Sequence, residues 1–262
     1  MKKLFGILLS IMLVFLVYGC DNKIINTWEE IESRGYIIVG LDDTFAPMGF
    51  RDNQGNIVGF DVDLAKEVFT RLGVEVRFQP IDWDSKVLEL NSGTIDMIWN
   101  GLSITEARQE QMLFSIPYLA NRQIILVSQA SDISLISDLQ GKKVGVQISS
   151  AAEDAVNANT ISTSFESLIK YDQYTQALLE LKNGSIDAVV IDEIMGRYII
   201  SQSEGDYKVA TDNFGEETFG VGFRKESESI RNQINLILEA MISDGTAAQI
   251  SVNWFDEDIF LK

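Results

Sequence analysis

GTIDMIWNG, residues 93 to 101, has a near-copy in GSIDAVVID, residues 184 to 192. In both copies a glycine comes at the end of a helix-like stretch and before a run of apolar residues. Glycine adopts the left-handed conformation that ends many helices, and the apolar run favours a buried strand. The pair therefore predicts one helix-to-strand element that occurs twice. Coincidence is the alternative, because Gly-x-Ile-Asp is common at such junctions.

Strand and helix signals alternate on both sides of the first copy. Residues 36–40 (YIIVG) are apolar and β-branched, which predicts a buried strand, and residues 74–78 alternate as a half-buried strand does. Between them, residues 59–72 place apolar side chains on one helix face and end before Gly73. A short helix is expected to follow and to stop near Gly93. This order predicts an α/β fold with largely parallel strands.

The same order returns after Tyr118. It predicts strands over 123–127 and 143–146, and helices over 171–182 and from Ile230 to Met241. Passages near 118–124 and 215–219 would carry the chain to a second half and back. Because ligands of open α/β sheets gather at the carboxyl ends of strands, the two copies of the repeat would end at facing edges of two lobes.

The composition excludes some classes of partner. The 262 residues contain 39 acidic and 21 basic residues, a formal charge of −18, and a polyanion needs basic patches that this balance does not favour. The charge serves solubility, or else mildly attracts cationic ligands. We therefore expect no nucleic-acid partner. No histidine is present and the only cysteine is Cys20, so we expect no metal site, no cofactor and no disulfide within one chain.

The N-terminal residues form a secretory leader. Two lysines precede an unbroken apolar run, which predicts a signal peptide over residues 1–19. The run ends in Val-Tyr-Gly-Cys, which resembles a bacterial lipobox, so Cys20 is the expected lipidation site and residues 20–30 a lipid-anchored linker. An ordinary signal peptide with a chance cysteine is the alternative. The sequence thus predicts an extracytoplasmic protein anchored to a bacterial membrane by lipid.

The first edge offers groups that suit a carboxylate. NGLSITEAR, residues 100–108, provides backbone N–H groups around Gly101, the hydroxyl of Ser103, and Arg108. A guanidinium presents a fork of donors that matches a carboxylate. The alternative is a capped helical turn with a surface arginine.

The second edge offers an anion and a helix N-terminus. Asp192 follows a buried strand and could meet an ammonium group, or could cap the next helix. Ser149 and Ser150 precede an expected helix whose free N–H groups favour an anion. An arginine, helix N–H groups and an aspartate together describe a site for an α-amino acid. Phe45 and Trp83 follow neighbouring strands and could sandwich a planar side chain, or could simply belong to the core.

Five motifs resemble the polar amino-acid solute-binding proteins of ABC importers, in that family's order from about residue 35 to the C-terminus. They are GFDVDLAKEV (59–68), NGLSITEAR (100–108), FSIPY (114–118), GVQISS (145–150) and IDAVVIDE (186–193). The resemblance implies a two-lobed periplasmic-binding-protein fold with two crossover hinge strands. Lobe 1 would comprise residues 31–118 and 219–262, and lobe 2 residues 122–215.

The resemblance also assigns roles to residues. Arg108 would bind the ligand's α-carboxylate with Ser103, the backbone of Gly101 and the amide of Ala151, and Asp192 would bind the α-ammonium. The ligand side chain would contact Asp42, Phe45, Trp83 and Gln147. The family commonly has Gly-Thr-Thr or Gly-Thr-Gly where this chain has Ser149, Ser150 and Ala151, so a hydroxyl contact at Ala151 is lost.

These inferences predict a monomeric, lipid-anchored receptor that captures a polar L-amino acid and presents it to an ABC permease. Asp42 beside two aromatic residues favours a basic or amide side chain. The first alternative is a ligand-sensing subunit for a signalling partner. The second is an enzyme of the periplasmic dehydratase type, whose acid–base chemistry would fall to carboxylates or lysine.

Overall fold

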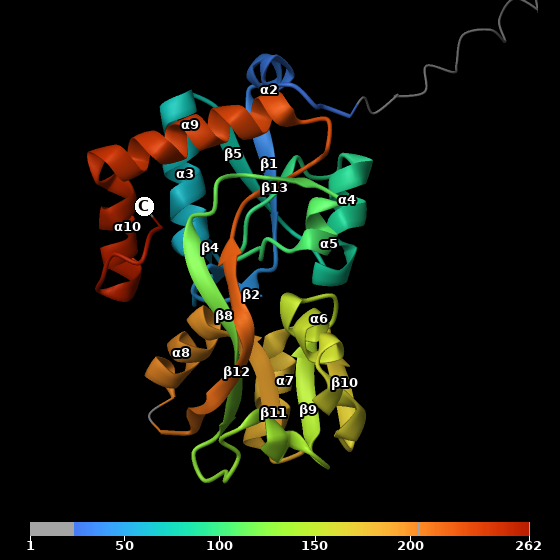
Figure 1. Ribbon diagram of the computed structural model, residues 1–262. Coiled ribbons are helices and arrows are strands. Elements are labelled where there is room, and N and C mark those ends of the chain that lie inside the picture. The colour runs from blue at the N-terminus through green and yellow to red at the C-terminus, as the bar shows by residue number, and fades with distance from the viewer. Residues whose placement is uncertain (1–23, 204, 262) are drawn as a thin grey trace, which may run out of the picture.

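The computed structural model describes residues 24–203 and 205–261. The expected signal peptide and Cys20 lie outside these residues. Within them the chain forms two lobes, one above the other in Figure 1, and each lobe is built around a five-stranded sheet.

The sheet of lobe 1 has the order β5-β1-β6-β13-β7. Its strands are β5 (Glu75–Pro80), β1 (Tyr36–Leu41), β6 (Met97–Ile98), β13 (Gly222–Phe223) and β7 (Leu113–Phe114). β1 pairs in parallel with β5 and β6, whereas β13 pairs antiparallel with β6 and β7. A strand from near the C-terminus is therefore inserted inside a sheet that the N-terminal part of the chain begins.

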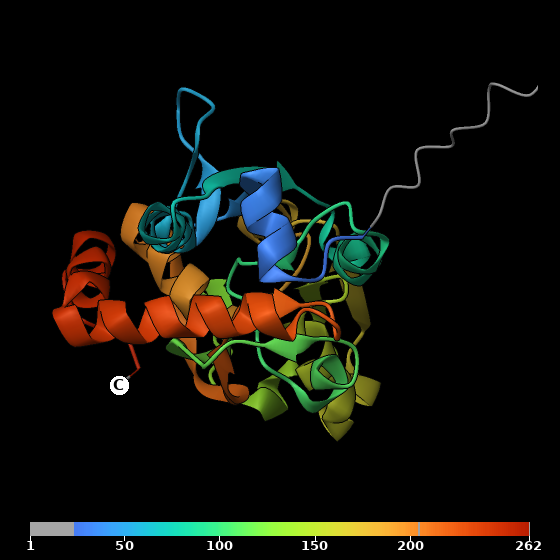
Figure 2. The same ribbon diagram turned by 90° about the horizontal axis from the view of Figure 1, so that it is seen from above.

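Helices cover this sheet, and a separate small sheet of three short strands packs against one of them, α3 (Phe60–Leu72). The helices are α2 (Trp28–Arg34), α3 (Phe60–Leu72), α4 (Lys86–Ser92), α5 (Glu106–Gln109), α9 (Glu228–Asp244) and α10 (Thr246–Phe255), and the 3₁₀ turn η1 (Trp83–Ser85) precedes α4. The short strands are β2 (Thr44–Phe45), β3 (Gly49–Arg51) and β4 (Ile57–Val58). Seen from above, α9 crosses the top of the lobe with α2 beside it (Figure 2).

The pattern of apolar residues explains α3. Phe60, Leu64 and Val68 recur every four residues and all are fully buried. Gly73 ends the helix at φ 68°, in the left-handed region that glycine adopts without a steric penalty.

The sheet of lobe 2 has the order β10-β9-β11-β8-β12. Its strands are β10 (Ser167–Tyr171), β9 (Lys143–Gln147), β11 (Ala188–Asp192), β8 (Leu119–Ser128) and β12 (Tyr207–Phe219). The helices are α6 (Ala151–Ala158), α7 (Tyr174–Lys182) and α8 (Glu193–Gln202), with two 3₁₀ turns, η2 (Ile136–Leu139) and η3 (Thr160–Ser164).

β8 and β12 connect the lobes. They pair antiparallel from Leu119–Phe219 at the lobe 1 end to Ser128–Tyr207 in lobe 2, with register shifts between Val209 and Glu216. Both strands run from one lobe into the other (Figure 1). The fold is thus the two-lobed α/β architecture with two crossover strands that the sequence predicted.

The repeated element is present in both lobes. Gly93 and Gly184 follow α4 and α7 with φ of 78° and 74°, and each precedes an interior strand of its sheet, β6 or β11. Burial is complete for Ile98 and Ile191, as the apolar runs predicted.

Some local predictions were wrong. The helix expected to begin at residue 171 begins at Tyr174, and Tyr171 instead ends β10, a strand that the sequence reasoning missed. β10 is only half-buried at the edge of its sheet, so it lacks a strong apolar signal. α2 begins at Trp28, inside the segment expected to be linker, because a Thr27–Glu30 capping box starts a helix there.

No helix among the described residues is long and apolar enough to cross a membrane.

Candidate functional site

A narrow cavity of about 10 Å³, room for about one water molecule, lies between the two lobes. Its wall contains all ten residues singled out in the sequence, together with Asn100. From lobe 1 these are Asp42, Phe45, Trp83, Asn100, Gly101, Ser103 and Arg108, and from lobe 2 Gln147, Ser150, Ala151 and Asp192. The structure therefore brings the ten together, and their contact with a ligand stays a prediction.

Gly101 occupies a place that only glycine fits. Its φ is 56°, and a Cβ there would lie 2.8 Å from Cε1 of Phe45. Its N–H donates to Oδ2 of Asp61 at 2.6 Å, and the hydroxyl of Tyr118 donates to the same oxygen at 2.9 Å. The N–H of Gly101 is therefore occupied within the protein, although the resemblance implied that this backbone would help hold a carboxylate.

Asp61 had no assigned role in the sequence reasoning. It lies in the first turn of α3 and is 1% exposed. Burial raises the pKa of Asp61 to about 7, although the hydrogen bonds from Gly101 and Tyr118 act in the opposite direction. Asp61 thus fixes the loop after β6 at the cost of burying a carboxyl group.

Arg108 is an unpaired buried cation. Thr105 caps the start of α5 as expected, but the guanidinium turns inward and the residue is 6% exposed, so the surface-arginine alternative is wrong. Nη1 donates to the carbonyl of Ser103 at 3.0 Å and Nη2 to that of Ser149 at 3.3 Å. Among the described residues no carboxylate forms an ion pair with Arg108, and burial lowers its pKa. The remaining donors suit an anion that enters the cavity.

Asp192 is an unpaired buried anion in the opposite lobe. It precedes α8 but its side chain does not cap that helix, which contradicts the capping alternative. Instead Oδ1 accepts from Nδ2 of Asn121 at 2.7 Å and Nε2 of Gln123 at 2.8 Å. Burial and then the charge of Glu217 raise its pKa well above the usual range. No cation in the described part of the chain pairs with Asp192.

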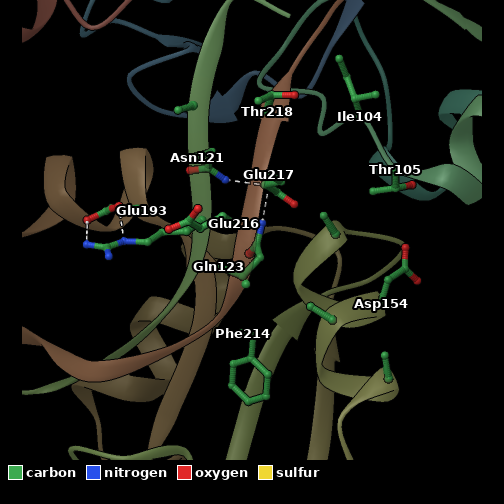
Figure 3. A pocket seen from close by; sticks show the side chains of 16 residues that line it. Ile104, Thr105, Asn121, Gln123, Asp154, Glu193, Phe214, Glu216, Glu217 and Thr218 are labelled. Atoms are coloured by element: carbon green, nitrogen blue, oxygen red, sulfur yellow. Dashed lines mark hydrogen bonds and ion pairs between the residues drawn. The ribbon is translucent and has the colours of Figure 1, made fainter. Parts of the chain in front are cut away.

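Glu217 is a further acid that the sequence reasoning missed. It lies on β12 opposite Asn121 of β8. Its Oε1 accepts from Ser103 Oγ at 2.6 Å, Asn121 Nδ2 at 2.7 Å and Gln123 Nε2 at 2.8 Å, and Figure 3 shows the two amides reaching it. Both amides therefore bridge Glu217 and Asp192. Only the register of two distant strands brings these groups together, so no local signal could reveal them.

Asp42 and Gln147 meet across the cavity. Oδ1 of Asp42 accepts from the N–H and hydroxyl of Thr44 at 2.9 and 2.6 Å, and Oδ2 accepts from Nε2 of Gln147 at 2.7 Å. Burial raises the pKa of Asp42 against these hydrogen bonds. The backbone N–H of Asp42 donates to Oδ1 of Asn100, whose buried Nδ2 has no partner within the described residues.

The two aromatic residues line the same cavity. Phe45 is 5% and Trp83 7% exposed. The ring of Phe45 lies 6.1 Å from that of Tyr174 in lobe 2, so this lining residue also makes an aromatic contact between the lobes.

The turn between β9 and α6 completes the wall. Ser150 caps α6 by accepting from the N–H of Glu153 at 3.1 Å, and its own hydroxyl donates to the carbonyl of Gln147 at 2.7 Å. Its hydroxyl is thus used within the protein, while Ala151 begins the helix at the cavity. The expected helix start at Ser150 is confirmed.

A wider, open groove lies on the other side of Glu217 (Figure 3). Its charged lining is mostly acidic, namely Asp154, Glu193, Glu216 and Glu217, with Arg122. Arg122 is already paired with Glu193 through two contacts of 2.5 and 2.7 Å. The groove therefore lacks a free guanidinium for a carboxylate, and the smaller cavity between the lobes is the better candidate site. In the described part of the chain no group of three His, Cys, Asp or Glu side chains could hold a metal ion.

Comparisons with known proteins agree with this geometry. The family model for bacterial extracellular solute-binding proteins, family 3, matches residues 37–257. An ABC uptake transporter substrate binding protein from Streptococcus pneumoniae, solved with bound histidine, is similar at 37% identity and a TM-score of 0.88, over 90% of this chain and 99% of that one.

Curated relatives show the same likeness. The histidine-binding periplasmic protein of Escherichia coli is 32% identical over 86% of this chain and 89% of its own. The L-cystine-binding protein TcyJ of Escherichia coli is 29% identical over 96% of each chain.

Proposed function

The chain belongs to the bacterial extracellular solute-binding proteins, family 3, and on that premise we propose that it holds a polar L-amino acid between its lobes and delivers it to an ABC importer. Members of this family are extracellular or periplasmic binding proteins rather than enzymes. The chain is accordingly a solute-binding protein.

The observation that carries the proposal is a pair of unmatched charges on opposite walls of one narrow cavity between the lobes. Arg108 of lobe 1 and Asp192 of lobe 2 are each nearly buried, and neither has an ion-pair partner among the described residues. Burying a charge without its counter-charge is costly. A zwitterionic α-amino acid supplies both counter-charges, with its carboxylate toward Arg108 and its ammonium toward Asp192.

The far part of the cavity suggests the kind of side chain. Asp42 and Gln147 offer an anion and an amide, with Phe45 and Trp83 as the apolar walls. A basic or amide side chain could bond to Asp42 and lie between the rings. The relatives described above are named for histidine and cystine or hold histidine, and they support a polar amino acid of this kind.

We further propose that Cys20 anchors the protein to the outer surface of the cytoplasmic membrane or to an equivalent bacterial membrane. The support is the lipobox-like Val-Tyr-Gly-Cys run at the end of the leader. Metabolic labelling with a fatty-acid analogue tests it, with Cys20→Ala as the unlabelled control.

A thermal-shift screen tests the amino-acid proposal. Residues 21–262, freed of ligand by unfolding and refolding, are screened against the common L-amino acids. A ligand that binds only the folded state raises the midpoint, and ligand at 100 Kd contributes roughly 2.7 kcal/mol. A clear shift with one or a few polar amino acids supports the proposal. No shift with any of them, in folded protein, counts against an amino acid as the ligand.

A further inference from the structure

Lys86 is a buried lysine outside the roles assigned above. It begins α4, directly after the turn that carries Trp83, and is only 4% exposed. Its Nζ donates to the carbonyl of Trp83 at 2.9 Å and to the carbonyl of Ser149 at 2.8 Å. Trp83 belongs to lobe 1 and Ser149 to lobe 2, so one amino group joins the two lobes. α4 and α5 lie above α6 where the lobes meet (Figure 1).

Ser149 is held from several sides. Its φ of 56° is in the left-handed region, which is unfavourable for a residue other than glycine. Its N–H donates to Oε2 of Glu153 at 2.6 Å, and its carbonyl accepts from both Lys86 and Arg108. The next residues, Ser150 and Ala151, line the cavity. The contacts of Ser149 therefore set where the turn before α6 lies relative to Arg108.

We propose that Lys86 is a positioning residue of the binding site. When the lobes close, its amino group donates a hydrogen bond to the carbonyl of Ser149, a contact that we call the clasp, and this contact fixes the turn of lobe 2 that faces Arg108. The inference rests on the proposed function, since the cleft closes around a ligand.

The charged groups around Lys86 do not neutralise it. Asp84 comes from its own side of the cleft, Arg108 from α5, and Glu153 and Asp154 from α6. Glu153 is occupied by Lys170 at 2.5 Å and by the N–H of Ser149. Among the described residues Lys86 forms no ion pair. Its protonated form is thus poorly compensated in the closed cleft.

Closure should therefore depend on pH. In the closed structure burial and then the charge of Arg108 lower the pKa of Lys86 to about 7, from an ordinary value of 10.5. When the cleft is open, the amino group of Lys86 is exposed to water and its pKa has that ordinary value. Between pH 7 and pH 10.5, closure therefore releases the proton of Lys86. The closed form becomes more favourable as the pH rises from 7, and it is least favourable below pH 7.

The test compares the wild type with Lys86→Met, which keeps the length of the side chain but cannot bond to Ser149. Isothermal titration uses L-arginine, or L-glutamine if arginine does not bind, because neither side chain titrates between pH 7 and pH 9. The ratio of the variant's Kd to the wild-type Kd is expected to rise by more than about tenfold between these two pH values. The ligand's own α-ammonium cancels in this ratio.

Two control variants make the result specific. Lys66→Met removes an exposed lysine from α3 and should follow the wild type at both pH values. Lys86→Arg keeps a cation that does not lose its proton. The ratio of its Kd to the wild-type Kd should therefore also rise with pH. A Lys86→Met ratio that stays constant with pH, in protein with normal circular dichroism, overturns the clasp.

A readout without ligand separates this inference from the proposed function. In small-angle scattering without ligand, the radius of gyration of the wild type should fall relative to that of Lys86→Met between pH 7 and pH 9, because other titrating groups of the cleft, such as Asp42 and Asp192, are common to both proteins. An equal response of both proteins overturns the clasp even if no amino acid binds. Absence of amino-acid binding together with this difference between the wild type and Lys86→Met counts against the proposed function alone.

Discussion

At the scale of single residues, Asp192 is a buried acid whose charge the ligand-free protein does not neutralise. Its carboxylate is buried beside Glu217 and receives only neutral amide donors, from Asn121 and Gln123. Such a group weakens the closed ligand-free form and favours the form that holds an ammonium. The ammonium group of a bound amino acid therefore supplies the counter-charge that Asp192 lacks in the protein alone, and this favours binding.

The substitution Asp192→Asn is expected to weaken amino-acid binding by at least about 30-fold, which corresponds to about 2 kcal/mol, because the ligand's ammonium loses its counter-charge. Titration calorimetry measures the loss. Asp132→Asn, exposed in lobe 2 and away from the cavity, is the matched control and should bind normally. Unchanged affinity of Asp192→Asn would refute the proposed orientation of the ligand.

Gly101 gives a second prediction at this scale. Gly101→Ala should lower the free energy of unfolding by about 1–3 kcal/mol more than Gly55→Ala does, because its Cβ would be forced against Phe45. Gly55 has a φ of 84° but open space around it, so Gly55→Ala loses only the free energy of forcing alanine into the left-handed backbone conformation. Urea unfolding of both variants measures the difference, and equal losses would contradict the clash.

At the scale of elements, α3 holds the binding loop through Asp61. The carboxyl group of Asp61 accepts from the N–H of Gly101 and from the hydroxyl of Tyr118, which directly precedes β8. One side chain in the first turn of a helix thus connects the loop after β6 with the start of a crossover strand.

This connection predicts a pH dependence of stability. The pKa of Asp61 is raised to about 7 in the folded protein from 3.8, so the folded state binds the proton more tightly. The resulting stabilisation is fully present below pH 3.8 and is lost as the pH rises toward 7. Asp61→Asn, which cannot titrate, should therefore show a smaller loss of thermal midpoint between pH 4.5 and pH 7.5 than the wild type. Asp132→Asn, exposed in lobe 2, should match the wild type, and an equal loss in Asp61→Asn would contradict the assignment.

The sequence predicted elements and residues whose signals are local. Short patterns were enough to find Gly93 and Gly184, the apolar strands after them, Asp192 at the end of β11, and Arg108 in the motif that follows β6. Asp61, Lys86 and Glu217 could not be found in this way, because their roles depend on contacts with residues 40 to 114 positions away. The edge strand β10 was missed because its residues, Ser167–Tyr171, neither alternate between apolar and polar nor form a continuous apolar run.

At the scale of the whole molecule, the two crossover strands allow one lobe to move against the other. The regular ladder of β8 and β12 is interrupted between Val209 and Glu216, where its register shifts. We expect bending to concentrate in this irregular stretch, because fewer regular backbone hydrogen bonds oppose it there.

Closure around a ligand can be measured with two spin labels. Leu88 on α4 and Leu179 on α7 are both exposed, one in each lobe, and residues 21–262 contain no cysteine that would compete for the label. Saturating amino acid should shorten the distance between labels at Leu88→Cys and Leu179→Cys. An unchanged distance in protein that binds its ligand would exclude closure of the lobes.

The position of β13 has a consequence for how the protein is made. β13 lies between β6 and β7 in the lobe 1 sheet, yet it is formed by Gly222–Phe223, after every strand of lobe 2. A chain synthesised from its N-terminus therefore completes the lobe 2 sheet first, while lobe 1 waits with a missing interior strand. Lobe 1, which begins the sequence, is therefore expected to complete its sheet after lobe 2, and until then the edges of β6 and β7 that β13 joins lack their partner strand.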